Sequence, residues 1–272
     1  MKPRPGKTRK WGQHFLTDRR ILSRILRVID PQAHDLIVEI GAGKGALTFL
    51  LAKTARKVIA IEMDRDLIPH LGSRKIDNLM IVERDALRVD FKTLLDAEDP
   101  RPESAKLVGN LPYSISSPLM FKVLENKGLF QRCVFLIQKE VAERITAQPG
   151  SKKYAPLSIL VHNHFSARVH FSIRPGSFSP PPKVESALIS LDRRASPLFE
   201  IPDEALFLEF LQMVFRQRRK ILLNNLRKSA WPADAVQAAF EKLGLKHTAR
   251  PEELSLEQFV KLNFFLTASE IQ

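Results

Sequence analysis

The sequence has a single cysteine and no long apolar run. Cys133 cannot form a disulfide within the chain, and its place in an apolar segment indicates a buried side chain. No apolar stretch of signal-peptide length follows the basic N-terminus, and no apolar segment is long enough to span a bilayer. These absences argue against a disulfide-stapled secreted protein and against a membrane protein, so we expect a cytoplasmic chain without a membrane partner.

Acidic residues are also scarce relative to basic ones. The chain has 30 Asp and Glu against 43 Lys and Arg, which gives a formal net charge of +13. Such an excess attracts polyanions, and nucleic acid is the expected partner ahead of an anionic membrane. With 272 residues, 44% of them apolar, the chain is long enough for a principal domain and a smaller appendage.

Short apolar runs alternate with helical patterns in the first half of the chain. Strands are predicted over residues 36–40, 58–61, 79–82, 107–109 and 133–137. A helix is predicted over 21–29, ahead of the first of these strands and ended by Pro31. This alternation is typical of an α/β fold, with a mainly parallel sheet covered by helices.

The pattern changes after Pro156. Residues 161–171 and 187–191 read as strands joined by a proline-rich segment, and because that segment has no room for a crossover helix, we expect them to pair antiparallel. Beyond Pro202 the apolar spacing is helical only, which places a domain boundary near 196–202 and predicts a small all-helical C-terminal domain.

A glycine-rich loop follows the first buried strand. Gly41 and Gly43 allow the sharp turn and close backbone approach that a nucleoside cofactor needs. Together with Ala46 they also satisfy a dinucleotide fingerprint, so on these residues alone NAD and S-adenosylmethionine fit equally well. Glu62, at the end of the second strand, is placed to bind ribose hydroxyls in either case. Asp85 follows the third strand, where it could bind an adenine or simply cap a turn.

The tetrapeptide Asn110-Leu111-Pro112-Tyr113 ends the fourth strand and is the most specific motif in the chain. The amino nitrogen of adenine is a poor nucleophile, and hydrogen-bond acceptors for its N–H groups stabilise the charge that develops as it attacks a methyl group. The Asn110 side chain and the Leu111 carbonyl could accept these bonds. Pro112 fixes the backbone, and Tyr113 offers a face for stacking on a flipped base. The alternative is a strand-ending turn with a buried tyrosine.

At this point the sequence resembles the ribosomal RNA adenine N6,N6-dimethyltransferases, specifically the small-subunit branch. The resemblance covers nearly the whole chain through the segments 12–16, 39–45, 61–64, 110–118, 138–141 and 178–187. It implies a Rossmann-like class I methyltransferase fold with a seven-stranded, mainly parallel sheet in residues 1–198, and a helical RNA-binding domain in 199–272. Residues 1–18 would form a basic arm and a cofactor-closing motif. The implied activity is dimethylation of two adjacent adenines near the 3′ end of 16S rRNA during ribosome biogenesis, with S-adenosylmethionine as cofactor.

The resemblance also implies roles for single residues at the cofactor. His14 and Leu16 would close over it, Gly41 and Gly43 would pass beneath its methionine part, Glu62 would bind its ribose, and Asp85 with Ala86 would hold its adenine.

At the target base, Asn110 would lie between cofactor and adenine, and Phe178 would form the second wall of a stack whose first wall is Tyr113. The chain departs from the commonest family pattern at His14 and Ser114, where many relatives have asparagine. These departures bear on affinity and on the balance of one methyl group against two.

A basic run follows an apolar helical stripe in the C-terminal region. Residues expected to contact RNA phosphates are Arg216, Arg218, Arg219, Lys220, Arg227 and Lys228, presented by a continuing helix. The alternative is a solvated helix face. His162 and His164 share one face of the predicted strand, but because no carboxylate or cysteine stands near them in the sequence, we expect no metal.

Three other functions remain open. One is the large-subunit rRNA dimethylase branch of the macrolide-resistance type, another is an RNA-binding assembly factor with secondary catalysis, and the last is an NAD-dependent oxidoreductase. We expect the chain to act as a monomer.

Overall fold

The computed structural model describes residues 13–98, 104–218, 220–227 and 231–268. The chain divides into two compact units. The first comprises Met1–Ala142 and Ser166–Arg193, and the second comprises Glu143–Phe165 and Arg194–Gln272. The division after Arg193 lies close to the expected boundary, whereas the segment 143–165 groups with the second unit. The two units are described separately below.

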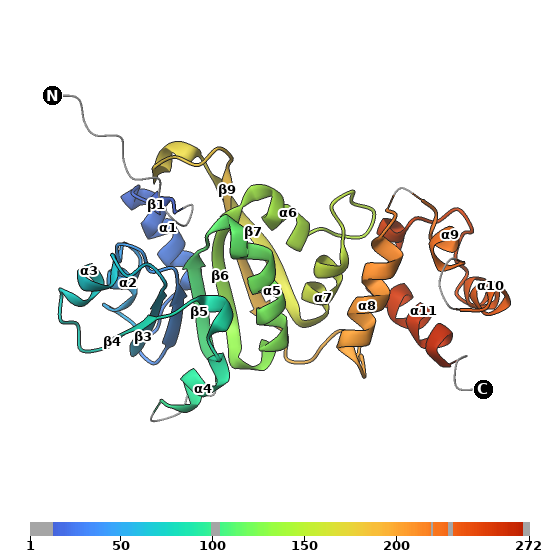
Figure 1. Ribbon diagram of the computed structural model, residues 1–272, viewed down its shortest axis with the longest axis horizontal. Coiled ribbons are helices and arrows are strands. Elements are labelled where there is room, and N and C mark those ends of the chain that lie inside the picture. Colours follow the sequence, from blue (N-terminus) through green and yellow to red (C-terminus); the bar gives the residue numbers. More distant parts are fainter. Residues whose placement is uncertain (1–12, 99–103, 219, 228–230, 269–272) are drawn as a thin grey trace. The chain divides into compact units, whose positions relative to one another are not determined.

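A seven-stranded sheet organises the first unit, with the strand order β4-β3-β2-β5-β6-β9-β7 (Figure 1). Its strands are β2 (Leu36–Ile40), β3 (Lys57–Glu62), β4 (Leu79–Glu83), β5 (Ala105–Asn110), β6 (Phe130–Gln138), β7 (Phe165–Ile173) and β9 (Ser186–Arg193). The first five pair in parallel, and β9 runs antiparallel to β6. The expected Rossmann-like α/β sheet, mainly parallel, is therefore confirmed.

Buried β-branched and leucine side chains explain why these segments form the centre of the sheet. All five residues of β2 are buried, and so are all residues of β5 except its last, Asn110. Strands buried on both faces read as continuous apolar runs in the sequence. The polar residues Glu62 and Asn110 stand at the C-terminal ends of β3 and β5, the edge at which open α/β sheets bind ligands.

Helices and turns connect the strands. The helices are α1 (Arg19–Ile29), α2 (Thr48–Leu51), α3 (Ile68–Gly72), α4 (Phe91–Asp96), α5 (Ser116–Glu125) and α6 (Lys139–Ile145). The 3-10 turns are η1 (Ala86–Arg88), η2 (Tyr113–Ile115), η3 (Lys127–Leu129) and η4 (Pro175–Ser177).

Helix α1 is defined by caps at both ends. The Asp18 carboxylate accepts from the backbone N–H groups of Arg20 and Ile21, at 2.8 and 3.3 Å. At the other end Asp30 adopts a left-handed conformation, and its N–H donates to the Leu26 carbonyl at 2.9 Å. The caps satisfy backbone groups that a helix end otherwise leaves unpaired.

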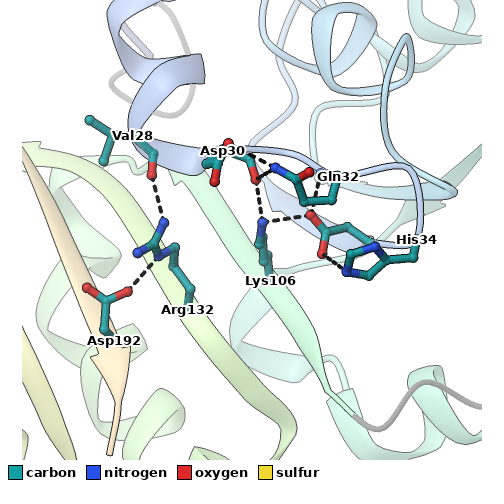
Figure 2. Close-up of polar contacts among 8 residues, drawn as sticks. Val28, Asp30, Gln32, His34, Lys106, Arg132 and Asp192 are labelled. Carbon is teal, nitrogen blue, oxygen red and sulfur yellow. Dashed lines mark hydrogen bonds and ion pairs between the residues drawn. The ribbon is translucent and has the colours of Figure 1, made fainter.

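Two cations from the sheet bind the C-terminal end of α1 (Figure 2). Lys106 Nζ, on β5, donates to the Asp30 carbonyl at 2.6 Å and lies 2.6 Å from an oxygen of the buried Asp35 carboxylate. Arg132, on β6, donates to the Val28 carbonyl at 3.3 Å. Positive charge at a helix C-terminus is favourable, so these contacts fix α1 against the sheet.

A separate two-stranded ribbon joins distant parts of the first unit. Strand β1 (Phe15–Leu16) pairs antiparallel with β8 (Phe178–Ser179). Thr17 N–H donates to the Ser177 carbonyl at 3.0 Å beside it. The sequence did not predict this ribbon, because two residues are too few to show a period.

The second unit is helical. It contains α7 (Pro156–His164), α8 (Glu204–Phe215), α9 (Leu222–Leu226), α10 (Ala233–Lys242) and α11 (Leu256–Ala268), with the 3-10 turn η5 (Pro251–Glu253). Aromatic rings fill its interior, where Phe259 contacts both Phe210 and Phe215 at centroid distances of 6.5 and 5.6 Å.

Two expectations for this unit were wrong. Residues 161–164 are helical, and the strand starts only at Phe165. Pro156 at the first turn and the hydrogen bond from Ala155 N–H to the Ser158 hydroxyl begin a helix over this apolar run. His162 and His164 are therefore helix residues: His162 Nε2 lies 3.0 Å from the Ala147 carbonyl, and His164 Nε2 lies 2.7 Å from Glu204. Helix α8 ends at Phe215, so the basic run beyond it lies in a turn and does not continue the helix.

The described part of the chain contains no helix that is both long and apolar enough to cross a bilayer. Over the same residues, no group of three or more His, Cys, Asp or Glu side chains is arranged to hold a metal ion.

Candidate active site

The glycine loop after β2 has the backbone conformation that its sequence predicts. Gly41 and Gly43 have positive φ angles of 71° and 57°, which other residues rarely adopt. A Cβ atom on Gly43 would lie 3.0 Å from the Phe15 ring, so a side chain there would also require that ring to shift. Gly41 N–H donates to the Ile61 carbonyl at 2.9 Å, which turns the loop across the end of β3.

Glu62 is the centre of this edge of the sheet. Its side chain is buried and accepts three backbone hydrogen bonds, from Gly43 at 2.8 Å and from Met63 and Asp64 at 2.9 Å each. These donors stabilise the carboxylate despite its burial. The carboxylate thus holds the glycine loop in place and keeps acceptor capacity for a ligand hydroxyl.

Two adjoining cavities meet at Gly41 and Glu62. One is lined by residues 13–15, Gly43 and residues 110–113. The other extends past residues 63–64 to residues 84–86 and 114–115. Their linings share Gln13, Gly41, Glu62 and Pro112, so the two cavities adjoin along the strand ends, and we call them together the trough. Most of the predicted cofactor residues line one or the other.

Asp85 lines the second of these cavities and also caps η1. One carboxylate oxygen accepts from Leu87 N–H at 2.9 Å, and the other lies 4.0 Å from Arg88 Nε. The turn-capping interpretation and the adenine-binding interpretation are therefore compatible, because a carboxylate has acceptor sites for both. Ala86 is buried beside it and adds an apolar surface to the lining of this cavity.

Asn110 is bound to the N-terminal segment. Its amide Nδ2 donates to the His14 carbonyl at 2.8 Å. This bond orients the amide and leaves Oδ1 as its acceptor. Leu111 is buried, and its N–H donates to the Leu136 carbonyl on β6 at 3.0 Å, so the backbone that follows β5 is anchored to the sheet.

Tyr113 is held at both ends of its side chain. Its hydroxyl lies 3.0 Å from the Ser186 hydroxyl on β9, and its ring lies 5.6 Å from the His14 ring. Partial burial raises the pKa of Tyr113 above its ordinary value, so the hydroxyl stays protonated at neutral pH. Ser186 is a contact that the sequence analysis missed, since 73 residues separate the two hydroxyls.

The ribbon of β1 and β8 adds a further contact to His14. Its Nδ1 lies 2.8 Å from the Pro180 carbonyl. His14 therefore connects three segments: the N-terminal strand, the proline-rich segment and, through its own carbonyl, Asn110.

The structure does not bring Phe178 to Tyr113. Phe178 is 4% exposed and pairs with Leu16 across the ribbon, and both side chains pack in the apolar cluster around α1. The cavity beside Tyr113 is lined by neither of them. A two-walled stack would require Phe178 to leave this cluster.

A larger cavity of about 740 Å³ lies beside the glycine loop. Leu16 lines it, together with Asn110, Gly43 and apolar residues of α1 and β6. The buried Glu39 carboxyl also faces it, and desolvation raises the pKa of Glu39 from 4.5 to about 8. The sequence analysis did not single out Glu39, because a glutamate inside an apolar strand gives no periodic pattern.

The second unit presents only part of the predicted RNA-binding set. Arg216, Lys220 and Arg227 are exposed. Arg218 is half-buried, and its guanidinium donates to the carbonyls of Lys152 and Tyr154. Arg219 and Lys228 lie outside the described residues.

A family model described as "Ribosomal RNA adenine dimethylase" matches residues 6–267. The chain belongs to the ribosomal RNA adenine dimethylase family.

Several members of this family are similar over almost their whole length. A "Ribosomal RNA small subunit methyltransferase A" of Syntrophotalea carbinolica is 41% identical over 262 residues, 96% of this chain and 97% of that protein. The protein of the same name from Clostridium acetobutylicum is 38% identical, covering 94% of this chain and 92% of its own.

Two solved structures are also similar to this chain over almost its whole length. A dimethyladenosine transferase from Plasmodium falciparum is 27% identical with a TM-score of 0.82, covering 94% of this chain and 98% of that one. The 23S rRNA methyltransferase ErmE is 26% identical with a TM-score of 0.71, covering 93% and 99%. These comparisons show that the trough, the glycine loop and Asn110 of this chain lie on a methyltransferase fold.

Proposed function

We propose that this protein transfers methyl groups from S-adenosylmethionine to the N6 amino groups of two adjacent adenines near the 3′ end of small-subunit rRNA, two to each base. One observation carries the proposal: the Asn110-Leu111-Pro112-Tyr113 segment lies in one trough with the glycine loop and Glu62. The names of the relatives that are 38% and 41% identical support the small subunit as substrate.

The trough fits the cofactor in the chemistry of its residues. Glu62 has acceptor capacity for ribose hydroxyls, Asp85 and Ala86 suit an adenine ring, and the positive φ angles of Gly41 and Gly43 would let the backbone pass close beneath the methionine part. His14 and Phe15 close the end of the trough. S-adenosylmethionine supplies a methyl group on a sulfonium, an activated electrophile that needs no metal.

The protein's own residues position and activate the base. Asn110 Oδ1 and the Leu111 carbonyl accept the two N–H bonds of the adenine amino group, which localises the nitrogen lone pair. As the carbon–nitrogen bond forms and the carbon–sulfur bond breaks, the nitrogen becomes positively charged and then releases a proton to solvent. Tyr113, held by Ser186, stacks on the flipped base. Positioning and acceptor electrostatics provide most of the acceleration.

In this proposal the first unit binds the target base, and the second unit binds the RNA backbone. Arg216, Lys220 and Arg227 would contact phosphates, while Arg218 supports the turn that carries Arg216. Residues 199–272 would form the RNA-binding domain, and 1–198 the methyltransferase domain. We propose a monomer that acts in the cytoplasm.

The test is transfer of labelled methyl from S-adenosylmethionine to unmethylated small ribosomal subunits, with large subunits and naked rRNA in parallel. The proposal expects N6,N6-dimethyladenosine in small-subunit RNA, located by mass spectrometry of nuclease fragments at two adjacent positions near the 3′ end. Label confined to large-subunit RNA would assign the protein to the branch that includes ErmE. Tight RNA binding without transfer would make it a binding factor.

A further inference from the structure

The solvent face of α1 is almost entirely arginine. Its exposed residues are Arg19, Arg20, Ser23, Arg24 and Arg27, and the helix contains no acidic residue. The opposite face is buried in the core through Leu22, Ile25 and Ile29. At 3.6 residues per turn, the four arginines share one arc of the helix surface. We call them the α1 arginine face.

These arginines are not neutralised by the protein. Within the described ranges, none of the four guanidinium groups forms an ion pair with a carboxylate, and that of Arg24 lies over the Phe171 ring, 3.7 Å from its centroid. Other surface cations do have acidic partners, as in Lys92 with Asp96 at 3.1 Å and Lys261 with Glu257 at 2.8 Å. The charge of the α1 arginine face is therefore available to an external anion.

The helix that carries these charges is held rigidly. Asp18 caps its N-terminus, and Lys106 and Arg132 bind carbonyls at its C-terminus (Figure 2). A fixed scaffold lowers the conformational entropy that binding would otherwise cost. The buried apolar side also removes one possible partner, because a basic amphipathic helix needs a free apolar face to insert into a membrane surface.

The α1 arginine face begins at the candidate active site. Arg19 and Ser23 line the large cavity that also contains Asn110 and Gly43. Only two residues, Thr17 and Asp18, separate α1 from the ribbon strand β1 that follows His14. An anionic polymer that enters the active site can therefore continue along this helix.

We propose that the α1 arginine face is a second phosphate-binding surface, which holds the RNA backbone next to the target adenines. The inference rests on the proposed function and deepens it. Arginines one turn apart, about 5.4 Å along the axis, can engage successive phosphates of one strand. Phosphate contacts position the RNA without reading its sequence.

The test compares two triple variants with equal loss of charge. The first is Arg20→Gln/Arg24→Gln/Arg27→Gln. The matched control is Arg65→Gln/Lys92→Gln/Lys153→Gln, three exposed cations outside residues 199–272 that already contact the acids Glu83, Asp96 and Glu143. The measurements are the salt dependence of binding to small-subunit rRNA, KM and kcat for small subunits, the dissociation constant for S-adenosylmethionine and the thermal unfolding midpoint.

The proposal expects the arginine variant to lower the slope of log affinity against log salt by about 2 to 3, since each phosphate contact contributes about 0.7 to 0.9. KM should rise at least tenfold with kcat and cofactor affinity unchanged, and the control should match the wild type. Equal slopes in the two variants would overturn the proposal. If the wild type itself transfers no methyl to small subunits, the proposed function fails, while the slope still decides whether this face binds RNA.

Discussion

The side chain of Asn110 donates a hydrogen bond of 2.8 Å to the main-chain carbonyl of His14. This bond joins the end of β5 to the N-terminal segment that lines the trough. The donor nitrogen is used by the protein itself, so the oxygen of the same amide is the group that can accept from a substrate. In the proposed function this one side chain has both a structural and a chemical role, and its variants should show both.

Replacing Asn110 by alanine should lower kcat by about 100-fold to 1,000-fold, as expected when one preorganised transition-state contact is removed. Cofactor affinity should fall as well, because the bond to His14 is lost. The matched control is Asn126→Ala, which removes an amide that donates to the main-chain carbonyl of Lys122 at the end of α5. Single-turnover methyl transfer and calorimetric titration measure the two effects. A kcat within threefold of the wild type would contradict the role of Asn110.

The hydroxyl pair of Tyr113 and Ser186 should act as a unit. Ser186→Ala and Tyr113→Phe each remove a hydrogen bond worth about 1 kcal/mol, which corresponds to roughly fivefold in kcat if it holds the ring in place. The double variant should be no slower than either single variant. Ser190→Ala is the control, a buried serine of the same strand that contacts His170 instead. Additive losses would show that the two hydroxyls are independent.

The pair of Lys106 and Asp35 should matter for stability more than for chemistry. Both side chains are buried, at 8% and 2% exposed, so Lys106→Met leaves an uncompensated carboxylate and should lower the free energy of unfolding by about 3 kcal/mol. Lys92→Met, which breaks an exposed pair, should cost less than about 1 kcal/mol. Urea denaturation of both variants gives the comparison. Adding Asp35→Asn to Lys106→Met should recover part of the loss, and no recovery would argue against the ion pair as its cause.

Glu39 should make stability depend on pH. Burial raises its pKa from 4.5 to about 8, so between these values the folded protein holds a proton that the unfolded chain releases. The free energy of unfolding must then fall as pH rises through this window, by up to about 1.4 kcal/mol per pH unit. Glu39→Gln removes this term, and between pH 6 and 7.5 it should gain about 2 kcal/mol relative to the wild type. If the free energies of unfolding of the two proteins changed equally with pH, the raised pKa of Glu39 would be contradicted.

Much of the first unit could be predicted from the sequence because its strands are buried on both faces. The strand at residues 36–40 was predicted with its observed ends, and the strands at 58–61 and 79–82 to within one residue at each end. The glycine loop and Asn110 could be placed too, since each directly follows such a strand. In these regions local pattern and tertiary burial agree.

What the sequence could not predict depends on contacts between distant segments. The bonds of His14 to Asn110 and of Tyr113 to Ser186 span 96 and 73 residues. The pattern at residues 161–164 predicts a strand where the structure has a helix, because a short buried apolar run fits either structure. Arg218 looked like its basic neighbours, and only the fold shows that its guanidinium binds carbonyls within the protein.

The ribbon of β1 and β8 can form only late in the synthesis of the chain. His14 contacts Pro180, 166 residues further along the chain, and proteins are synthesised from the N-terminus. Strand β1 therefore has no partner strand until the proline-rich segment has left the exit tunnel. Such non-local pairing is also slow to form. The ribbon therefore closes only after about two thirds of the chain has been synthesised, and the N-terminal segment waits unpaired until then.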